Sequence, residues 1–161
     1  GRIIMTCASS IFGDMYEASF SASKMALVGL VNSLHLEGKE HGIAVNSITP
    51  HVVTNMTVNH LAPAVRPLFS KTTVLSAVLY LCSSKSPSGQ HVFAAAGGIS
   101  HAEVVVHAAS RFSAEECTPE VIHSRWGEIY RAKPCRGRSS GESQVLAWAM
   151  AAAEQRDIEL E

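Results

Sequence analysis

The sequence predicts an α/β fold, in which helices alternate with the strands of a parallel sheet. Three short runs of β-branched and apolar residues, at 2–6, 43–48 and 91–96, are typical of buried strands. Two longer apolar segments, at 14–38 and 71–83, have the lengths of helices and lie between those runs. Because strand and helix alternate along the chain, we expect the strands to pair in parallel.

The longest predicted helix, at 14–38, carries apolar residues on more than one face. We therefore expect one side to pack against the sheet and the other to meet a partner. Gly42 follows this helix and suits the left-handed turn that ends many helices. Residues 51–70 contain Pro63 and Pro67 and little periodicity, which predicts a mobile, partly helical excursion.

Beyond residue 100 the pattern is weaker. Residues 102–107 predict a further short strand, and Thr118 followed by Pro119 predicts the start of a helix. A chain of 161 residues with 47% hydrophobic residues can bury one core. The expected division is a domain at 1–131, a linker at 132–143 and a C-terminal helix at 144–161.

Composition argues against several classes of function. The net charge is −1 and the sequence pI about 6.8, so binding to nucleic acid or to a membrane surface through charge is not expected. No stretch approaches 18 apolar residues without a charge, and no cationic leader precedes an apolar segment. We therefore expect neither a membrane span nor a secretory signal.

The cysteines and histidines do not form a metal-binding pattern. The spacing of the four cysteines contains no C-x-x-C, which favours free thiols in a reducing compartment. The eight histidines show no H-E-x-x-H or Cys/His spacing, so no metal site is predicted.

The most informative motif is Phe20-Ser-Ala-Ser-Lys24, at the start of a long apolar run. Residues four apart lie one turn apart on the same face of a helix, so the ring at 20 and the ammonium at 24 should point into one pocket. A tyrosine in the first position could exchange protons, because a nearby lysine lowers the pKa of a phenol. Phenylalanine cannot exchange a proton at any pH.

Further motifs occur in a consistent order around this one, and the chain resembles the short-chain dehydrogenase/reductase family. The motifs are Gly1-Arg-Ile-Ile-Met-Thr6, Leu27-Val-Gly-Leu-Val-Asn-Ser-Leu34, Glu37-Gly38 and Val45-Asn-Ser-Ile-Thr-Pro50. The resemblance implies the C-terminal part of a Rossmann-like, doubly wound parallel sheet. The first strands and the glycine-rich loop of that fold are expected to be lacking, because the sequence has no G-x-G-x-x-G.

Within this family the chain looks most like the (3R)-hydroxyacyl-coenzyme A dehydrogenases of peroxisomal fatty-acid metabolism. The residues that carry this likeness are Leu79-Tyr-Leu-Cys82, Gly97-Gly98 and Thr118-Pro-Glu…Trp126. The likeness implies an acyl-coenzyme A substrate, an intracellular location that is cytoplasmic or peroxisomal, and a homodimer formed through the helix at 14–38.

The resemblance also implies where the catalytic residues lie. Phe20 stands in place of the family's tyrosine. Lys24 matches the family's lysine, which lowers the pKa of that tyrosine and contacts the nicotinamide ribose. The family's serine lies thirteen residues before the tyrosine, and that position is Cys7, whose thiol is a weak donor. Two interpretations stay open: Cys7 occupies the serine position, or a one-residue slip in the short strand brings the serine pair Ser9 and Ser10 nearer to it.

The cofactor implied by the resemblance is NAD(H) or NADP(H), contacted by Lys24, Pro50, Val53 and Thr54. The missing phosphate loop weighs against binding by the chain alone. His51 replaces a glycine of the family's Pro-Gly-x-Val/Ile-x-Thr motif, and it reads either as a new acid/base group or as a solvated loop histidine.

Three functional interpretations follow. The first is a dehydrogenase for secondary alcohols whose catalysis is strongly impaired. The second is a pseudoenzyme or dimerisation module. The third is a decayed product without a retained role.

Overall fold

The computed structural model describes residues 1–133. The predicted helix at 144–161 and nearly all of the predicted linker at 132–143 lie outside the described residues. The chain divides into two compact units, Gly1–Ala102 and a second unit that begins at Glu103. The sheet and the two long helices belong to the first unit.

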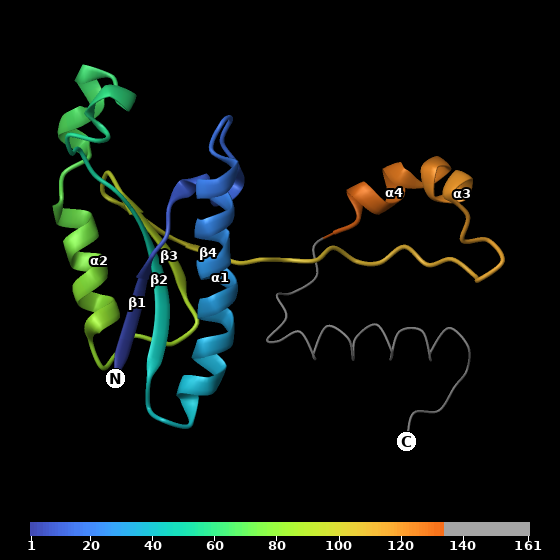
Figure 1. The fold of residues 1–161 in the computed structure, drawn as a ribbon, viewed down its shortest axis with the longest axis horizontal. Helices are drawn as coiled ribbons and strands as arrows, with labels where there is room; N and C mark the ends of the chain where they lie inside the picture. The colour runs from blue at the N-terminus through green and yellow to red at the C-terminus, as the bar shows by residue number, and fades with distance from the viewer. Residues whose placement is uncertain (134–161) are drawn as a thin grey trace. The chain divides into compact units, whose positions relative to one another are not determined.

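The first unit is built on a four-stranded sheet with the order β1-β2-β3-β4 (Figure 1). The strands are β1 (Arg2–Thr6), β2 (Ala44–His51), β3 (His91–Ala95) and β4 (Gly98–Ala102). The first three strands pair in parallel, with Ile3 opposite Val45 and Thr49 opposite Phe93. The predicted α/β class and the parallel pairing are thereby confirmed.

The expected strand at 102–107 is wrong. The chain instead turns back after β3 and forms β4 antiparallel to it, with Ala95 opposite Gly98. Ala96 and Gly97 have φ of 47° and 81°, and positive φ at both positions is typical of the tight two-residue turns of β-hairpins. The periodicity of the sequence did not reveal this turn, because alanine rarely adopts positive φ.

Strand β2 is longer than expected and continues through Pro50 to His51. Proline cannot donate a ladder hydrogen bond, so it is usually confined to strand edges. The pairing of β1 with β2 ends at Thr6 opposite Ile48, which leaves one edge of β2 without a neighbouring strand at Pro50. The extension matters for function because it places His51 within the sheet.

Two helices cover opposite faces of the sheet, α1 (Ala18–Lys39) and α2 (Thr72–Cys82) (Figure 1). Helix α1 begins four residues later than expected, because Tyr16 has a φ of 67° that a right-handed helix cannot contain. Gly42, with a φ of 63°, makes the predicted left-handed turn after the helix. The predicted helix at 71–83 corresponds closely to α2.

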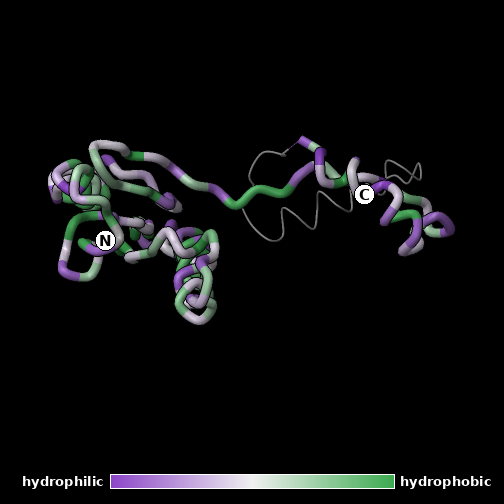
Figure 2. The backbone as a smooth tube through the Cα atoms, turned by 90° about the horizontal axis from the view of Figure 1, so that it is seen from above, coloured by the Kyte–Doolittle hydropathy of each residue, from purple (hydrophilic) through white to green (hydrophobic). Residues whose placement is uncertain are grey.

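The hydrophobic core lies mainly between α2 and the sheet. Leu81 and Ala77 of α2 are buried against Ile48 of β2 and Ala94 of β3. On the α1 side, Val28, Val31 and Val45 are buried. Figure 2 shows hydrophobic residues recurring along the strands and helices of this unit. A sheet with apolar residues on both faces requires a helix layer on each side, which is the observed arrangement.

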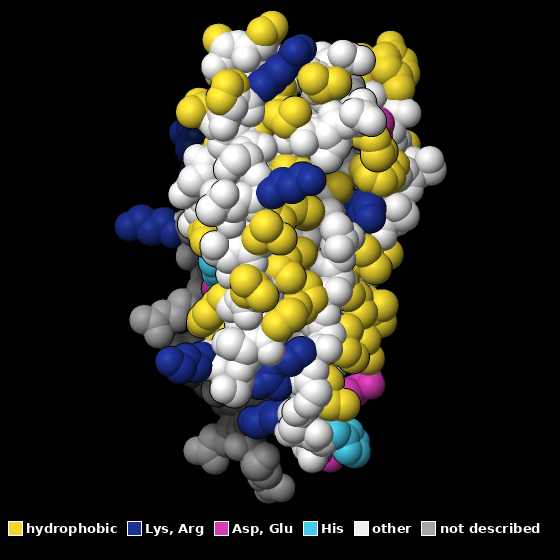
Figure 3. All heavy atoms as spheres, turned by 90° about the vertical axis from the view of Figure 1, so that its left-hand side faces the viewer, with side chains coloured by type: hydrophobic (Ala, Val, Ile, Leu, Met, Phe, Trp, Pro, Cys, Tyr) yellow, Lys and Arg dark blue, Asp and Glu magenta, His cyan; other side chains and the backbone are white. Residues whose placement is uncertain are grey.

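The outer side of α2 is not covered in the described part of the chain. Leu75 and Leu79 are 58% and 71% exposed there. Figure 3, which looks from this side, shows hydrophobic side chains interspersed with lysines and arginines.

The predicted excursion at 51–70 contains two 3₁₀ helices, η2 (Val58–His60) and η3 (Pro63–Leu68). It is thus partly helical, as expected. Phe69, directly after η3, returns towards the end of β2, because its carbonyl oxygen accepts a hydrogen bond from the N–H of Val53 at 3.0 Å.

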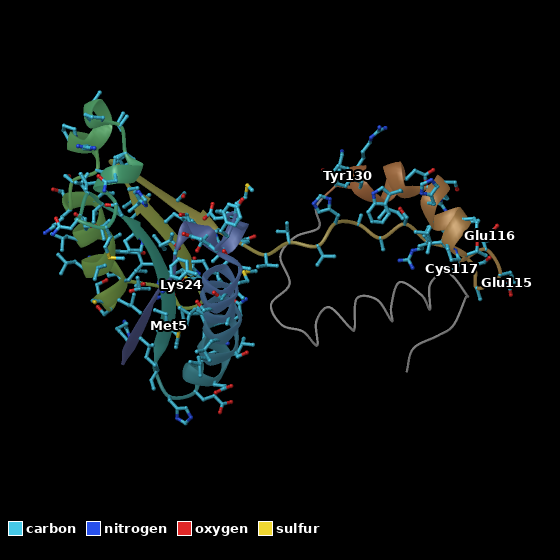
Figure 4. All side chains as sticks on the ribbon, turned by 45° about the horizontal axis from the view of Figure 1, so that its top comes forward. Met5, Lys24, Glu115, Glu116, Cys117 and Tyr130 are labelled. Carbon is cyan, nitrogen blue, oxygen red and sulfur yellow. The ribbon has the colours of Figure 1, made fainter. Side chains whose placement is uncertain are left out.

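The second unit contains two short helices, α3 (Pro119–Ser124) and α4 (Trp126–Arg131). The predicted cap is confirmed: the hydroxyl of Thr118 accepts a hydrogen bond from the N–H of Val121 at 3.3 Å. Arg125 forms an ion pair with Glu128 at 2.9 Å, and its guanidinium lies over the Phe112 ring at 4.6 Å. Figure 4 labels Glu115, Glu116, Cys117 and Tyr130 in this unit.

Candidate functional site

An open cavity of about 410 Å³ lies where the parallel strands β2 and β3 end. Ligands of open α/β sheets bind at the carboxyl ends of the strands, and this volume falls within the usual range of small-molecule sites. The cavity is lined by Ser9, Thr49, His51, Phe69, Phe93, Ala94, Ala95, Gly98, Ile99 and Ser100. It is therefore the strongest candidate site in the described part of the chain.

Strand alternation explains which side chains reach this cavity. Side chains two residues apart on a strand share a face, so Thr49 and His51 of β2 lie on the same side of the sheet. Phe93 of β3 lies opposite Thr49 in the register, and the β-hairpin adds Ser100 from β4. One wall is therefore formed by the ends of three neighbouring strands.

Aromatic contacts hold two residues of the lining in place, Phe93 and His51. Phe12, at the end of the 3₁₀ helix η1 (Ser9–Phe12), stacks on Phe93 with ring centroids 5.7 Å apart. Phe69 meets the His51 ring edge to face at 5.5 Å. The cavity consequently combines hydroxyl groups and an imidazole with apolar aromatic surface.

The structure distinguishes the two alternatives for the position of the family's serine, because Cys7 and Ser9 lie in different surroundings. Cys7 is 4% exposed, and its thiol donates to the carbonyl oxygen of Lys24 at 3.6 Å. Cys7 therefore points towards α1 and does not line the cavity. Ser9, two residues later in η1, does line it.

Lys24 and Phe20 lie side by side on α1, as their spacing predicted, but neither is among the residues that line the cavity. The ammonium nitrogen of Lys24 is 5.5 Å from the centroid of the Phe20 ring and donates to the carbonyl oxygen of Thr6 at 3.1 Å. Figure 4 labels Lys24 on α1 and Met5 on β1. One of the three ammonium protons is thus used within the protein, and two remain for a ligand.

The other positions implied for cofactor binding are partly occupied by internal hydrogen bonds. The N–H of Val53 donates to Phe69, as described above. The hydroxyl of Thr54 accepts from the N–H of Met56 at 3.2 Å and lies 3.2 Å from the hydroxyl of Thr57. Pro50 lies within β2 opposite Ala94. The ammonium of Lys24 thus keeps two protons that a ligand could accept, whereas the N–H of Val53 is used within the protein.

A polar network between α1 and the sheet was not expected from the sequence. Nδ1 of His91 lies 2.7 Å from the hydroxyl of Ser47, and Nε2 lies 2.9 Å from the amide oxygen of Asn32. Burial lowers the pKa of His91 below its usual 6.5, and His101 and His35 lower it further through charge repulsion. The available signal was the position of His91 in a buried strand, two residues before Phe93.

Other types of site receive no support in the described residues. No group of three or more His, Cys, Asp or Glu side chains within 1–133 could hold a metal ion. None of the helices there is both long and apolar enough to cross a bilayer. Cys7, Cys82 and Cys117 are free thiols.

Comparison with known proteins identifies the class. The family model described as short chain dehydrogenase matches residues 1–64. The chain belongs to the short-chain dehydrogenase/reductase family, in agreement with its sheet and with the cavity at the strand ends.

Individual relatives are multifunctional peroxisomal enzymes. The chain is 36% identical over 140 residues to the peroxisomal hydratase-dehydrogenase-epimerase of Saccharomyces cerevisiae. The matched segment covers 83% of this chain and 16% of that protein. It is 32% identical over 133 residues to the peroxisomal multifunctional enzyme type 2 of Mus musculus, covering 80% of this chain and 18% of that protein. The chain therefore spans less than a fifth of either relative.

A solved structure gives the same result. Full-length peroxisomal multifunctional enzyme type 2 from Drosophila melanogaster matches with a TM-score of 0.65 and 27% identity, covering 95% of this chain and 29% of that one.

Proposed function

We propose that the chain is part of an NAD(P)-dependent dehydrogenase for (3R)-hydroxyacyl-coenzyme A, with impaired proton transfer. The observation that carries this proposal is the cavity at the carboxyl ends of β2 and β3, in a chain whose relatives are peroxisomal multifunctional enzymes. A cytoplasmic or peroxisomal location is part of the proposal.

The residues of the chain would act as follows. Ser9 can donate a hydrogen bond to the alcohol or ketone oxygen of the substrate. Lys24 can bind the ribose of the nicotinamide cofactor with its two remaining protons. The bound nicotinamide supplies the acceptor for the hydride. Phe20 lies beside Lys24 but cannot take the proton of the alcohol.

The expected consequence is slow catalysis. General acid–base groups contribute about 10²–10⁴-fold to the rate, and this contribution is lost because Phe20 carries no ionisable group. The chain contains no G-x-G-x-x-G motif, so a further segment would have to bind the cofactor phosphates.

The test is a calorimetric titration with NADH, first of the chain alone and then of the chain with the amino-terminal half of a related dehydrogenase fused in front. Binding in the fusion only would support the proposal. Absence of binding in both, with a folded protein by circular dichroism, would refute it. Rapid reduction of NAD by the chain with a hydroxyacyl substrate would refute the impairment.

A second candidate function, a non-catalytic dimerisation module, is favoured by the outer face of α1. Met25 and Leu36 are 42% and 43% exposed there, and residues 25–36 contain no Asp, Glu, Lys or Arg. A solvated helix face normally carries charges, so this face is suited to contact with a second copy.

Gly29 allows a sharp test of this alternative. A Cβ at this position would meet nothing within 4 Å, so Gly29→Arg should leave the fold intact. We expect sedimentation to show a dimer for the native chain and for Gly29→Ala, and a monomer for Gly29→Arg. A native chain that sediments as a monomer would exclude the dimerisation module.

A further inference from the structure

His51 is the one imidazole among the side chains that line the cavity. The other polar groups of the lining are the hydroxyls of Ser9, Thr49 and Ser100. His51 is half-buried, and the edge-to-face contact with Phe69 at 5.5 Å restricts the orientation of its ring. An imidazole held in this way is arranged to bind a ligand.

The position of His51 follows from the extension of β2. Because the strand continues through Pro50, His51 pairs with Ala95 and shares a face of the sheet with Thr49. A histidine in a solvated loop would have none of these restraints. The sequence left two interpretations of His51 open, a new acid/base group and a solvated loop histidine. The structure places the residue in strand β2, in the wall of the cavity.

The cavity lining also indicates what kind of group His51 would meet. Phe69, Phe93 and Ile99 give an apolar surface, and the polar groups accompany it. Such a site suits a short aliphatic chain that carries an oxygen atom. We propose that His51 donates a hydrogen bond to the oxygen at carbon 3 of a 3-oxoacyl thioester. This inference rests on the proposed function.

Ser9, which lines the cavity from η1, would be a second donor to the same oxygen. Two donors on one ketone oxygen favour a 3-oxoacyl group over an acyl group without that oxygen. When the acyl group lacks the oxygen, both donors lose their hydrogen bonds to water and gain none from the ligand. The selectivity for the oxygen at carbon 3 is thus assigned to His51, a residue that the sequence motif of the family does not contain.

The experiment compares two thioesters that differ at carbon 3. Acetoacetyl-coenzyme A carries the ketone oxygen, and butyryl-coenzyme A has the same chain length without it. We expect the native chain to bind acetoacetyl-coenzyme A about tenfold more tightly in calorimetry, the usual size of one good hydrogen bond. His51→Ala should reduce this preference to the part that Ser9 supplies, whereas His41→Ala, which removes an exposed histidine outside the cavity lining, should leave it unchanged.

A second measurement requires no stable variant. The ring signals of His51 in the native chain should shift in NMR spectra on addition of acetoacetyl-coenzyme A and stay in place with butyryl-coenzyme A. Equal affinity for both thioesters, with unmoved His51 signals, would overturn the role of His51 and leave the proposed function standing. A folded chain that binds neither thioester would overturn both.

Discussion

The imidazole of His91 connects α1 to the centre of the sheet. An amide oxygen can only accept, so Nε2–H of His91 donates to Asn32, and the Ser47 hydroxyl donates to Nδ1. His91 is 7% exposed and Ser47 is 1% exposed. Three segments far apart in the sequence are therefore joined by two short hydrogen bonds.

This network predicts a pH dependence of stability. The pKa of folded His91 is lowered, first by burial and then by His101 and His35, so the folded state binds its proton less readily than the unfolded state. The stabilisation by neutral His91 is fully present above the unfolded pKa of about 6.5 and is lost as the pH falls from there towards the folded pKa.

Urea unfolding of the native chain and of His91→Gln between pH 8 and pH 5 measures this effect. Glutamine keeps a donor and an acceptor but does not titrate in this range. We expect the difference in unfolding free energy between the two proteins to shrink below pH 6.5. If the unfolding free energies of the native chain and of His91→Gln changed in parallel with pH, His91 would not be desolvated in the folded state.

The core between α2 and the sheet predicts a large cost for truncation. Leu81 is 1% exposed and packs with Ile48, Ala77 and Ala94. Leu81→Ala should lower the free energy of unfolding by about 2–5 kcal/mol, through lost burial and a new cavity. Leu79→Ala, on the 71% exposed side of the same helix, should change it by less than about 0.5 kcal/mol. Equal effects in denaturant titrations would contradict the assigned helix face.

Restoring a phenol at position 20 tests the pairing with Lys24. In Phe20→Tyr the new hydroxyl would lie near an ammonium whose nitrogen is 5.5 Å from the present ring centroid. Its pKa should therefore fall below the usual value of about 10, as followed by tyrosinate absorbance. Adding Lys24→Met should remove the shift, and an unshifted phenol in Phe20→Tyr itself would argue against the pairing.

The same substitution should raise catalysis. In the fusion with an amino-terminal half, reduction of acetoacetyl-coenzyme A by NADH is expected to increase about 10²–10⁴-fold in Phe20→Tyr. An unchanged rate, in a protein that still binds NADH, would mean that Phe20 does not limit the reaction.

The turn between β3 and β4 predicts a stabilising substitution. Ala96 has a φ of 47°, a conformation that costs an alanine about 1 kcal/mol. Asparagine tolerates it and is favoured before glycine in this type of turn. Ala96→Asn should raise the free energy of unfolding by about 0.5–1 kcal/mol, whereas the β-branched Ala96→Val should lower it. The reverse order in urea titrations would show that the turn has another geometry.

The sequence alone predicted the parallel strands and the two long helices, but not the hairpin strand β4. Hydrophobic periodicity gave the helix now seen as α2 and the parallel strands, and the spacing of Phe20 and Lys24 placed both on one face of α1. Thr118 and Pro119 marked a helix start correctly. These features depend on interactions within a few residues, which a linear pattern records.

Only the tertiary structure decided which residues meet. Cys7 lies just after β1 and is buried against α1, whereas Ser9 begins η1 and lines the cavity. His51 lines the cavity because β2 continues past Pro50, and His91 meets Asn32 because the register brings β3 beside β2 under α1. Such contacts join segments some 40 to 60 residues apart, and no local preference of the chain encodes them.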